Sequence, residues 1–258
     1  MNFFHAKEDR DSNEMEKNAD TFHPSFFEIL KKAEEKYFWF EVRRRWIFDS
    51  IADYMPPPAR LLEIGCGTGN VSSYLAQKGY RVTGCEYYDE ALAMAWPGFE
   101  KVCADGANLP FPDNTFDVVG LFDVIEHLPD ERDTLKEAYR VLRPGGLVVV
   151  TVPAREELWS PVDEASFHKR RYTKAAVRHI FSSVSLDTVS ITYIFMSLYL
   201  PIMLMRRRKI SISDQFALHN ALNAALKLLL DLERRLARLI SLPIGTSLIA
   251  IGRKGTEP

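Results

Sequence analysis

The sequence has few cysteines, no marked excess of charge of either sign and no long uninterrupted apolar run. Its three cysteines, Cys66, Cys85 and Cys103, form neither an even set nor a CxxC pair, which argues against a disulfide scaffold and against a zinc site. We expect them to be small core residues in a reducing, cytoplasmic compartment. A formal net charge of -2 gives no basic field, so nucleic acid is not an expected partner.

The first residues contain no apolar core of signal-peptide length, and acidic residues are scattered among them. We expect residues 1–20 to be a disordered tail and 21–258 to form one domain. A helical pattern runs from Phe22 to Met55 and ends at the prolines 56–58.

Apolar runs and helical patterns then alternate along the chain. The predicted strands are 60–67, 81–87, 101–106, 116–124, 147–153, 186–195 and 245–254. Helical patterns separate the first five of them, at 70–80, 89–96 and 130–142 among others. This alternation predicts an α/β fold in which a mostly parallel sheet carries helices on both faces.

Glycines or acidic residues follow each of the first four predicted strands. They are Gly65, Gly67 and Gly69, then Glu86, Asp105 and Asp123. Because ligands of such sheets lie beyond the carboxyl ends of the strands, these residues predict one binding site.

The spacing of the glycines restricts the ligand. The dinucleotide fingerprint is GxGxxG, whereas this chain has GxGxG with Asn70 in the place of the last glycine. Glu63, just before the glycines, is awkward beside a pyrophosphate but suits a ligand with an amino group. Glu86 ends the second strand, where a carboxylate can accept hydrogen bonds from both hydroxyls of a ribose. A nicotinamide-dependent oxidoreductase is therefore the disfavoured alternative.

Four segments carry a resemblance to a known family. They are LLEIGCGTGN, GCEYYDEALAMA, ADGANLPFPDNTFDVV and EAYRVLRPGGLVVVTVP. Together they resemble the class I S-adenosylmethionine-dependent methyltransferases, and best the small-molecule group that includes the ubiquinone-biosynthesis O-methyltransferases. The resemblance covers a cofactor-binding core at 61–153. It implies a Rossmann-like sheet of seven strands and S-adenosyl-L-methionine as cofactor, with S-adenosyl-L-homocysteine as product.

The resemblance also implies roles for individual residues. Gly65, Gly67 and Gly69 would lie under the methionine part, with Glu63 near its amino group and Glu86 on the ribose. Asp105, Gly106 and Ala107 would face the adenine, and Phe122 and Asp123 would border the sulfonium. Cys66 and Tyr87 complete the expected cofactor site. A plain tight turn and exposed strand-end charges are the alternatives.

An oxygen acceptor must lose its proton, so a base is expected beside the methyl group. The candidate catalytic residues are Asp123 and His127 after the fourth strand and His168 in a predicted loop at 160–173. His127 could instead only orient its loop, and Lys169–Arg171 could be a solvated face. No metal is assigned. The alternative is a magnesium site at Asp123, Glu126, His127 and His168, since some relatives hold magnesium with E-x-x-E-H.

Two further segments flank the core. Similar enzymes use an N-terminal helix as a lid, which would bring Tyr37, Trp39 and Arg43 to the cofactor; the alternative is that the aromatics dock this helix on the sheet. A helical insertion at 195–242 precedes the last strand. Its second half predicts an amphipathic helix. The expected apolar face is Leu222, Leu226, Leu229 and Leu236, opposite Arg234, Arg235 and Arg238.

The apolar stretch that begins this insertion ends in four basic residues, Arg206 to Lys209. It predicts a cap over the substrate pocket or a dimer surface, with peripheral membrane contact through 191–210 as the alternative; the oligomeric state stays open. The sequence therefore predicts an S-adenosylmethionine-dependent methyltransferase that methylates a small-molecule or lipid-linked acceptor at oxygen. A catalytically silent S-adenosylmethionine-binding protein is the remaining alternative.

Overall fold

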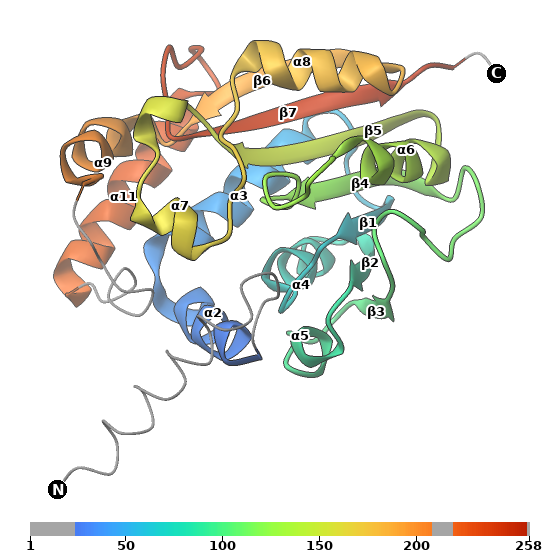
Figure 1. Cartoon of the computed structure of the whole chain (residues 1–258), viewed down its shortest axis with the longest axis horizontal. Coiled ribbons are helices and arrows are strands. Elements are labelled where there is room, and N and C mark those ends of the chain that lie inside the picture. Colours follow the sequence, from blue (N-terminus) through green and yellow to red (C-terminus); the bar gives the residue numbers. More distant parts are fainter. Residues whose placement is uncertain (1–23, 208–218, 257–258) are drawn as a thin grey trace, which may run out of the picture.

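The computed structural model describes residues 24–207 and 219–256 (Figure 1). The expected disordered tail at 1–20 lies outside these residues. A seven-stranded sheet runs through the molecule in the order β3-β2-β1-β4-β5-β7-β6. The strands are β1 (Arg60–Ile64), β2 (Arg81–Glu86), β3 (Glu100–Cys103), β4 (Phe116–Phe122), β5 (Leu142–Pro153), β6 (Leu186–Ile194) and β7 (Ser247–Lys254). Only β7 is antiparallel to its neighbours, β5 and β6, so the predicted mostly parallel Rossmann-like sheet is confirmed.

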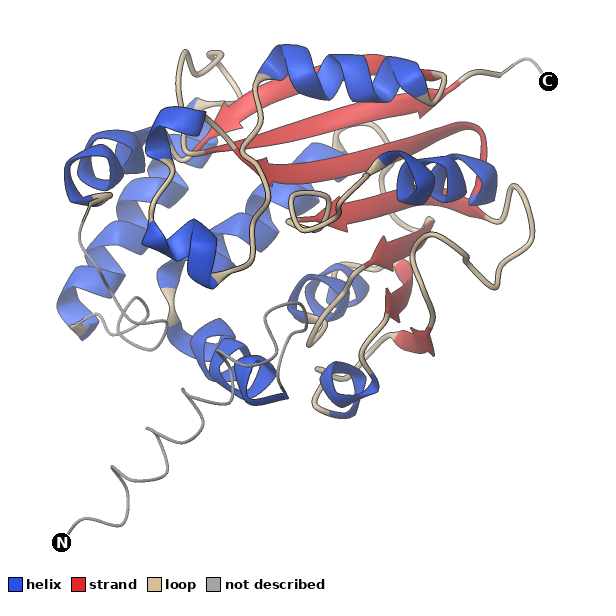
Figure 2. Cartoon of the chain, viewed as in Figure 1, coloured by secondary structure: helices blue, strands red, loops and turns tan. Residues whose placement is uncertain are grey.

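Helices cover both faces of the sheet, as predicted (Figure 2). The longer ones are α2 (Pro24–Lys36), α3 (Phe38–Ala52), α4 (Asn70–Gln77), α6 (Arg132–Val141), α8 (Lys174–Ser183) and α11 (Asn220–Leu236). Short elements are α5 (Asp89–Ala93), η1 (Glu156–Leu158), α7 (Pro161–Ala165), η2 (Met196–Leu198) and α9 (Tyr199–Met205). In the described ranges, no helix combines the length and the apolar character needed to cross a bilayer.

The apolar core has two parts, one on each face of the sheet. On one face, α6 and α8 bury residues such as Leu135 and Phe181 against the strands. On the other face, α3, α4 and α11 bury Ile47, Leu75 and Leu230. Burial of this apolar area at about 25 cal/mol per Å² is the main term that holds the layers together.

The helical run predicted from Phe22 to Met55 is two helices rather than one. Tyr37 adopts an extended conformation between α2 and α3. The break is bridged by Asn223 of α11, whose Oδ1 accepts from the Phe38 amide at 2.9 Å and whose Nδ2 donates to the Lys36 carbonyl at 2.8 Å. A side chain from the far end of the chain therefore satisfies the backbone groups that the interruption frees.

Three other local expectations are corrected. Cys103 is exposed rather than in the core, because β3 is an edge strand, while Cys66 and Cys85 are buried. The predicted loop at 160–173 contains the short helix α7. Strand β5 begins at Leu142, earlier than predicted, and its register against β4 shifts before Leu147.

Candidate functional site

The strand register places the predicted cofactor residues side by side at the carboxyl ends of β2, β1 and β4. Ile64 of β1 lies opposite Cys85 of β2 on one side and Leu121 of β4 on the other. The residues that follow, Gly65, Glu86 and Phe122, therefore leave the sheet side by side. Strand order reverses here, with β2 on one side of β1 and β4 on the other, and this switch point is where open α/β sheets bind ligands.

The three glycines of the first turn all adopt positive φ, between +53° and +73°. Two of them are also packed against side chains. A Cβ on Gly65 would lie 2.7 Å from Val124 Cγ2, and one on Gly69 would lie 2.3 Å from Phe99 Cζ. A Cβ on Gly67 would meet no protein atom within 4 Å. Gly67 therefore presents bare main chain to open space, as a closely bound ligand requires.

Glu63 is buried directly beneath this turn. It accepts a hydrogen bond from the Ser72 hydroxyl at the start of α4. Burial raises the pKa of Glu63 to about 7, although the Ser72 bond works in the opposite direction. A neighbouring cation would stabilise the ionised form of this buried carboxyl group. The ligand amino group predicted to lie here would be such a cation.

Glu86, predicted to hold a ribose, also ties two loops together. Its Oε2 accepts from the Gly67 amide at 2.8 Å, and its Oε1 accepts from the Tyr87 and Tyr88 amides at 2.8 and 3.1 Å. A carboxylate has about four acceptor positions, and these bonds use both positions of Oε1 and one of Oε2, so one position on Oε2 remains for a ligand hydroxyl.

The remaining predicted cofactor residues differ in exposure. Asp105 is exposed and accepts from the Ala107 amide at 2.9 Å, which shapes the turn after β3. Gly106 packs against Ile64, and Tyr87 is 64% exposed. Cys66 is buried, and its amide donates to the Cys85 carbonyl at 3.0 Å. Its side chain therefore belongs to the core, while its backbone belongs to the glycine turn.

Helix α3 reaches the end of β4 through one buried arginine. Arg43 donates to the Phe122 carbonyl at 2.7 Å and forms an ion pair with Asp123. Asp123 has a φ of +56°, an unusual value for a residue other than glycine, and its amide donates to the Thr151 carbonyl at 2.9 Å. The arginine of the predicted lid thus fixes the strained end of β4.

Sequence reasoning missed Glu34, which joins α2 to the glycine turn. Its Oε2 accepts from the Thr68 hydroxyl at 2.6 Å and from Trp96 Nε1 at 2.8 Å. Burial raises the pKa of Glu34, against the effect of these two bonds. Nothing in the sequence distinguishes Glu34 from Glu35, because only the fold shows which of them faces the turn.

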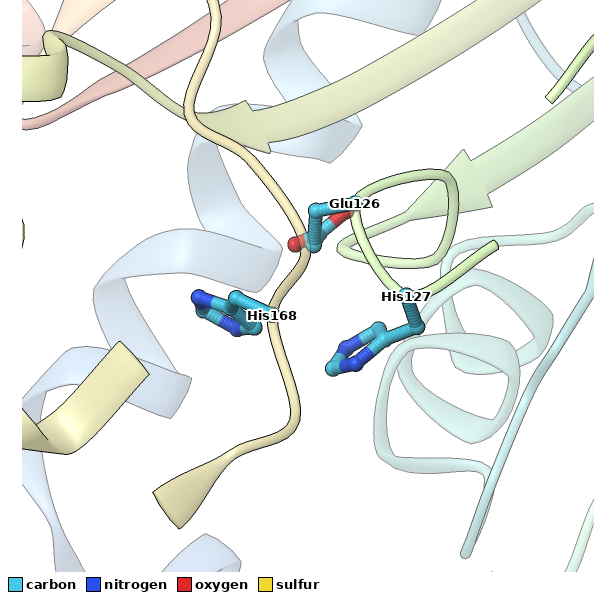
Figure 3. A group of neighbouring side chains, drawn as sticks. All are labelled: Glu126, His127 and His168. Carbon is cyan, nitrogen blue, oxygen red and sulfur yellow. The ribbon is translucent and has the colours of Figure 1, made fainter. Parts of the chain in front are cut away.

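Glu126, His127 and His168 come together beside the end of β4 (Figure 3). One ligand atom from each lies within 4.8 Å of the others, and the two imidazole centroids are 4.9 Å apart. Both carboxylate oxygens of Glu126 are buried without a hydrogen-bond partner in the described structure. Burial raises the pKa of Glu126, and the nearby Asp123 carboxylate adds to this. Burial lowers the pKa of His127 to about 4, helped by His168.

Asp163 of α7 positions His168. Its Oδ1 lies 2.9 Å from His168 Nδ1, and its two oxygens accept from Arg171 at 2.8 and 3.0 Å. Although burial acts in the opposite direction, the His168 and Arg171 bonds lower the pKa of Asp163. Arg170 donates to the carbonyls of Leu128 and Pro129. Arg170 and Arg171 are therefore structural contacts rather than a solvated face.

The cluster differs from the magnesium site considered from the sequence. Asp123 is paired with Arg43, so the carboxylate that remains beside the two imidazoles is Glu126. Magnesium prefers oxygen ligands, whereas two imidazoles with one carboxylate suit a divalent transition metal.

Comparison with known proteins fits this geometry. Residues 62–150 match a family model described as "Methyltransferase domain". The chain is 33% identical over 161 residues to a "Probable S-adenosylmethionine-dependent methyltransferase" of Mycolicibacterium smegmatis, covering 60% of this chain and 61% of that protein. It is 31% identical over 140 residues to the 2-methyl-6-phytyl-1,4-hydroquinone methyltransferase of Synechocystis sp., covering 52% of this chain and 42% of that protein. Residues 62–150 therefore match the methyltransferase domain family, and over this region the chain is similar to S-adenosylmethionine-dependent methyltransferases.

The fold comparison agrees with this family. A Thermotoga maritima structure titled "SAM-dependent methyltransferase, possible histamine N-methyltransferase" superposes with a TM-score of 0.58 at 21% identity, covering 89% of this chain and 97% of that one. S-adenosyl-L-methionine is the cofactor that gives the family its name, and the oxidoreductase alternative receives no support. The chain spans less than two thirds of the length of the curated relatives compared here.

Proposed function

We propose that this methyltransferase-family protein transfers the methyl group of S-adenosyl-L-methionine to an oxygen of a small-molecule or lipid-linked acceptor. The observation that carries the proposal is the cluster of Glu126, His127 and His168 at the end of β4, beside the glycine turn. The Synechocystis relative supports an acceptor of hydroquinone type, because its name specifies a phytyl hydroquinone. A cytoplasmic protein in peripheral contact with a membrane, through the region 191–210, is part of the proposal.

The residues present fit the proposed cofactor. Gly67 offers main chain with free space above it, and Glu63 and Glu86 place carboxyl groups below and beside that space. When bound, S-adenosyl-L-methionine supplies an electrophilic methyl group on a positively charged sulfur. The two carboxyl groups of the chain would hold the amino group and the ribose, and Phe122 would border the sulfur.

The chain's own contribution to the reaction is to position the acceptor and remove its proton. The pKa of His127, lowered to about 4 by burial, keeps its imidazole neutral at physiological pH but also makes it a weak base, so its role as base depends on direct contact with the acceptor hydroxyl. S-adenosyl-L-methionine would supply the methyl group, with its sulfur as the leaving group, and the imidazole of His127 would take the proton that the acceptor oxygen loses. His168, held by Asp163, would orient the acceptor, while Asp123 is fixed by Arg43 next to the reacting centre.

A metal-assisted version of this reaction is the second candidate. Its support is the short distance among Glu126, His127 and His168, with Asp163 orienting His168 as carboxylates orient metal-bound histidines. In that version a divalent transition metal would bind the acceptor oxygen and lower its pKa, so that His127 would not act as a base.

The direct test has two steps. Calorimetry with S-adenosyl-L-homocysteine and with NAD should show binding of the first only. The protein is then incubated with labelled methyl donor and metabolite extracts, and a labelled product with an acid-stable methyl ether is expected. Binding without any labelled product would favour the catalytically silent alternative, and absence of binding would overturn the proposal.

A further inference from the structure

Helix α11 has one charged side and one side rich in leucine, as the amphipathic pattern predicted. Its charged side faces the protein, and most of its leucines face outward. Leucine and isoleucine side chains of α11 and the turn after it are between 46% and 83% exposed. They are Leu222, Leu228, Leu229, Leu232, Leu236, Leu239 and Ile240. Of the four leucines predicted to share the apolar face, only Leu226 packs against the core.

The inward side of α11 explains this orientation, because charges on α3 pair with it. Asp231 pairs with Arg45 at 3.2 Å, Lys227 pairs with Glu41 at 2.5 Å, and Arg234 pairs with Asp49. Glu233 is buried and accepts from the Met196 and Ser197 amides of η2, both at 2.7 Å. These bonds fix the rotation of the helix about its axis, and within residues 24–207 and 219–256 nothing covers its outward-facing leucines.

Helix α9 continues the apolar surface. It follows directly on η2, which Glu233 fastens to α11. Its Leu200 and Leu204 are exposed, as is Met205, and Arg206 and Arg207 follow. We call the exposed leucines of α9 and α11, with Met205, Leu239 and Ile240, the leucine surface.

Exposed basic side chains predominate along the border of the leucine surface, although Arg238 pairs with Asp53 at 2.6 Å and Arg235 lies 3.5 Å from Asp231. The only acidic residues within α9 and α11 are Asp231 and Glu233, and both face inward to their partners. Arg207 is exposed, and the Arg235 and Arg238 side chains are 71% and 54% exposed. An apolar face bordered by outward arginines is the pattern of a helix that lies in the interface of an anionic bilayer.

We propose that the leucine surface docks this protein on anionic lipid membranes. A second copy of the chain is a poorer occupant, because a two-fold contact would bring together two borders in which Arg207, Arg235 and Arg238 outnumber Asp53, the exposed carboxylate beside them. Since α11 is bonded to α3, which carries Arg43 to the end of β4, the docked face belongs to the same helical layer as the site. A lipid-linked acceptor could then reach the site from the bilayer.

The test measures vesicle binding without methyl donor, so its outcome is independent of the proposed chemistry. The full-length protein is floated with vesicles of phosphatidylcholine alone and of phosphatidylcholine with phosphatidylglycerol. We expect binding to the anionic vesicles, weaker at high salt. Leu228→Gln/Leu232→Gln/Leu236→Gln should weaken it by about tenfold or more, because three apolar side chains no longer enter the bilayer. Tyr54→Gln, an exposed apolar position outside the surface, should leave it unchanged.

A second pair of variants tests the charges. Arg207→Gln/Arg235→Gln should reduce binding to anionic vesicles, while Arg132→Gln/Lys136→Gln on α6 should not. Thermal melts and calorimetry with S-adenosyl-L-homocysteine verify that each variant is folded. The proposal is overturned if the wild-type protein does not float, or if the leucine variant floats equally well. It is also overturned if that variant changes a dimer into a monomer while vesicle binding persists.

Discussion

Arg43 of α3 is bonded to both the backbone and the side chain at the end of β4. It donates to the Phe122 carbonyl at 2.7 Å and pairs with the Asp123 carboxylate. A helix from the N-terminal part of the chain is thereby fastened to the strand end that the proposed cofactor borders. One side chain therefore joins the predicted lid helix to the end of β4.

Replacing Arg43 should therefore destabilise the fold and loosen the site together. Arg43→Gln leaves Asp123 without its ion-pair partner, and we expect a loss of roughly 3 kcal/mol in the free energy of unfolding. S-adenosyl-L-homocysteine should also bind more weakly by calorimetry. The double variant Arg43→Gln/Asp123→Asn should recover part of the stability, since no charge remains unpaired. If the stability losses of the two single variants simply add in the double variant, Arg43 and Asp123 do not stabilise each other.

The glycine turn offers a matched pair of substitutions. Gly67 and Gly69 both have positive φ, so alanine at either costs about 1–2 kcal/mol in backbone strain. Gly69→Ala would also press on Phe99, at 2.3 Å, and should lose about 1–3 kcal/mol more in urea unfolding. Gly67→Ala should lose only the strain, yet weaken S-adenosyl-L-homocysteine binding by about tenfold or more, about 1.4 kcal/mol. Equal affinity in Gly67→Ala and wild type would place the ligand elsewhere.

Local pattern was enough to predict the strand ends, because the glycines and Glu86 are set by short-range spacing. The orientation of α11 was not predictable in this way. Its leucines form an apolar stripe, but its partners Asp49 and Glu41 lie far away in the sequence. The break at Tyr37 likewise depends on Asn223, close to the other end of the chain. Contacts between polar groups far apart in the sequence decide both features, and local pattern does not reveal such contacts.

The pKa of Glu63 predicts a pH dependence of stability. The folded value of about 7 lies above the unfolded value of about 4.3, so the folded state binds more protons between them. The stabilising effect of the protonated carboxyl is complete at low pH and is lost as pH rises through 7. Glu63→Gln should therefore be more stable than wild type at pH 8, with a smaller difference at pH 5, by urea unfolding. Exposed Glu156→Gln should show neither difference.

The ionisation of Glu63 also predicts that ligand affinity rises with pH, whereas its contribution to stability falls. Deprotonated Glu63 attracts the amino group of S-adenosyl-L-homocysteine, so wild-type affinity should rise between pH 6 and 8. In Glu63→Gln the affinity should be lower and nearly independent of pH in this range, as measured by calorimetry. A parallel rise in the variant would mean that another group causes it.

Replacing His127 should lower the catalytic rate without changing cofactor binding. Removing a general base typically costs about 10²-fold or more in rate, so His127→Gln should lower kcat by at least that factor. Its S-adenosyl-L-homocysteine affinity should stay unchanged, because His127 lies on the acceptor side of the site in this proposal. His179→Gln on the outside of α8 is the matched control and should retain full activity. A change confined to KM would indicate that His127 only positions the acceptor.

Exhaustive chelation decides between the proton-transfer and the metal-assisted reaction. Burial raises the pKa of Glu126, with Asp123 adding to the effect, so the protonated carboxyl is favoured and cation binding must first displace that proton. Arg43 already pairs with Asp123. We therefore expect the chelated protein to contain no bound transition metal by mass spectrometry and to transfer labelled methyl groups at the full rate. The metal-assisted reaction would instead be established if chelation abolished activity and zinc or manganese restored it. In the His168→Gln variant, the same metals should then fail to restore activity.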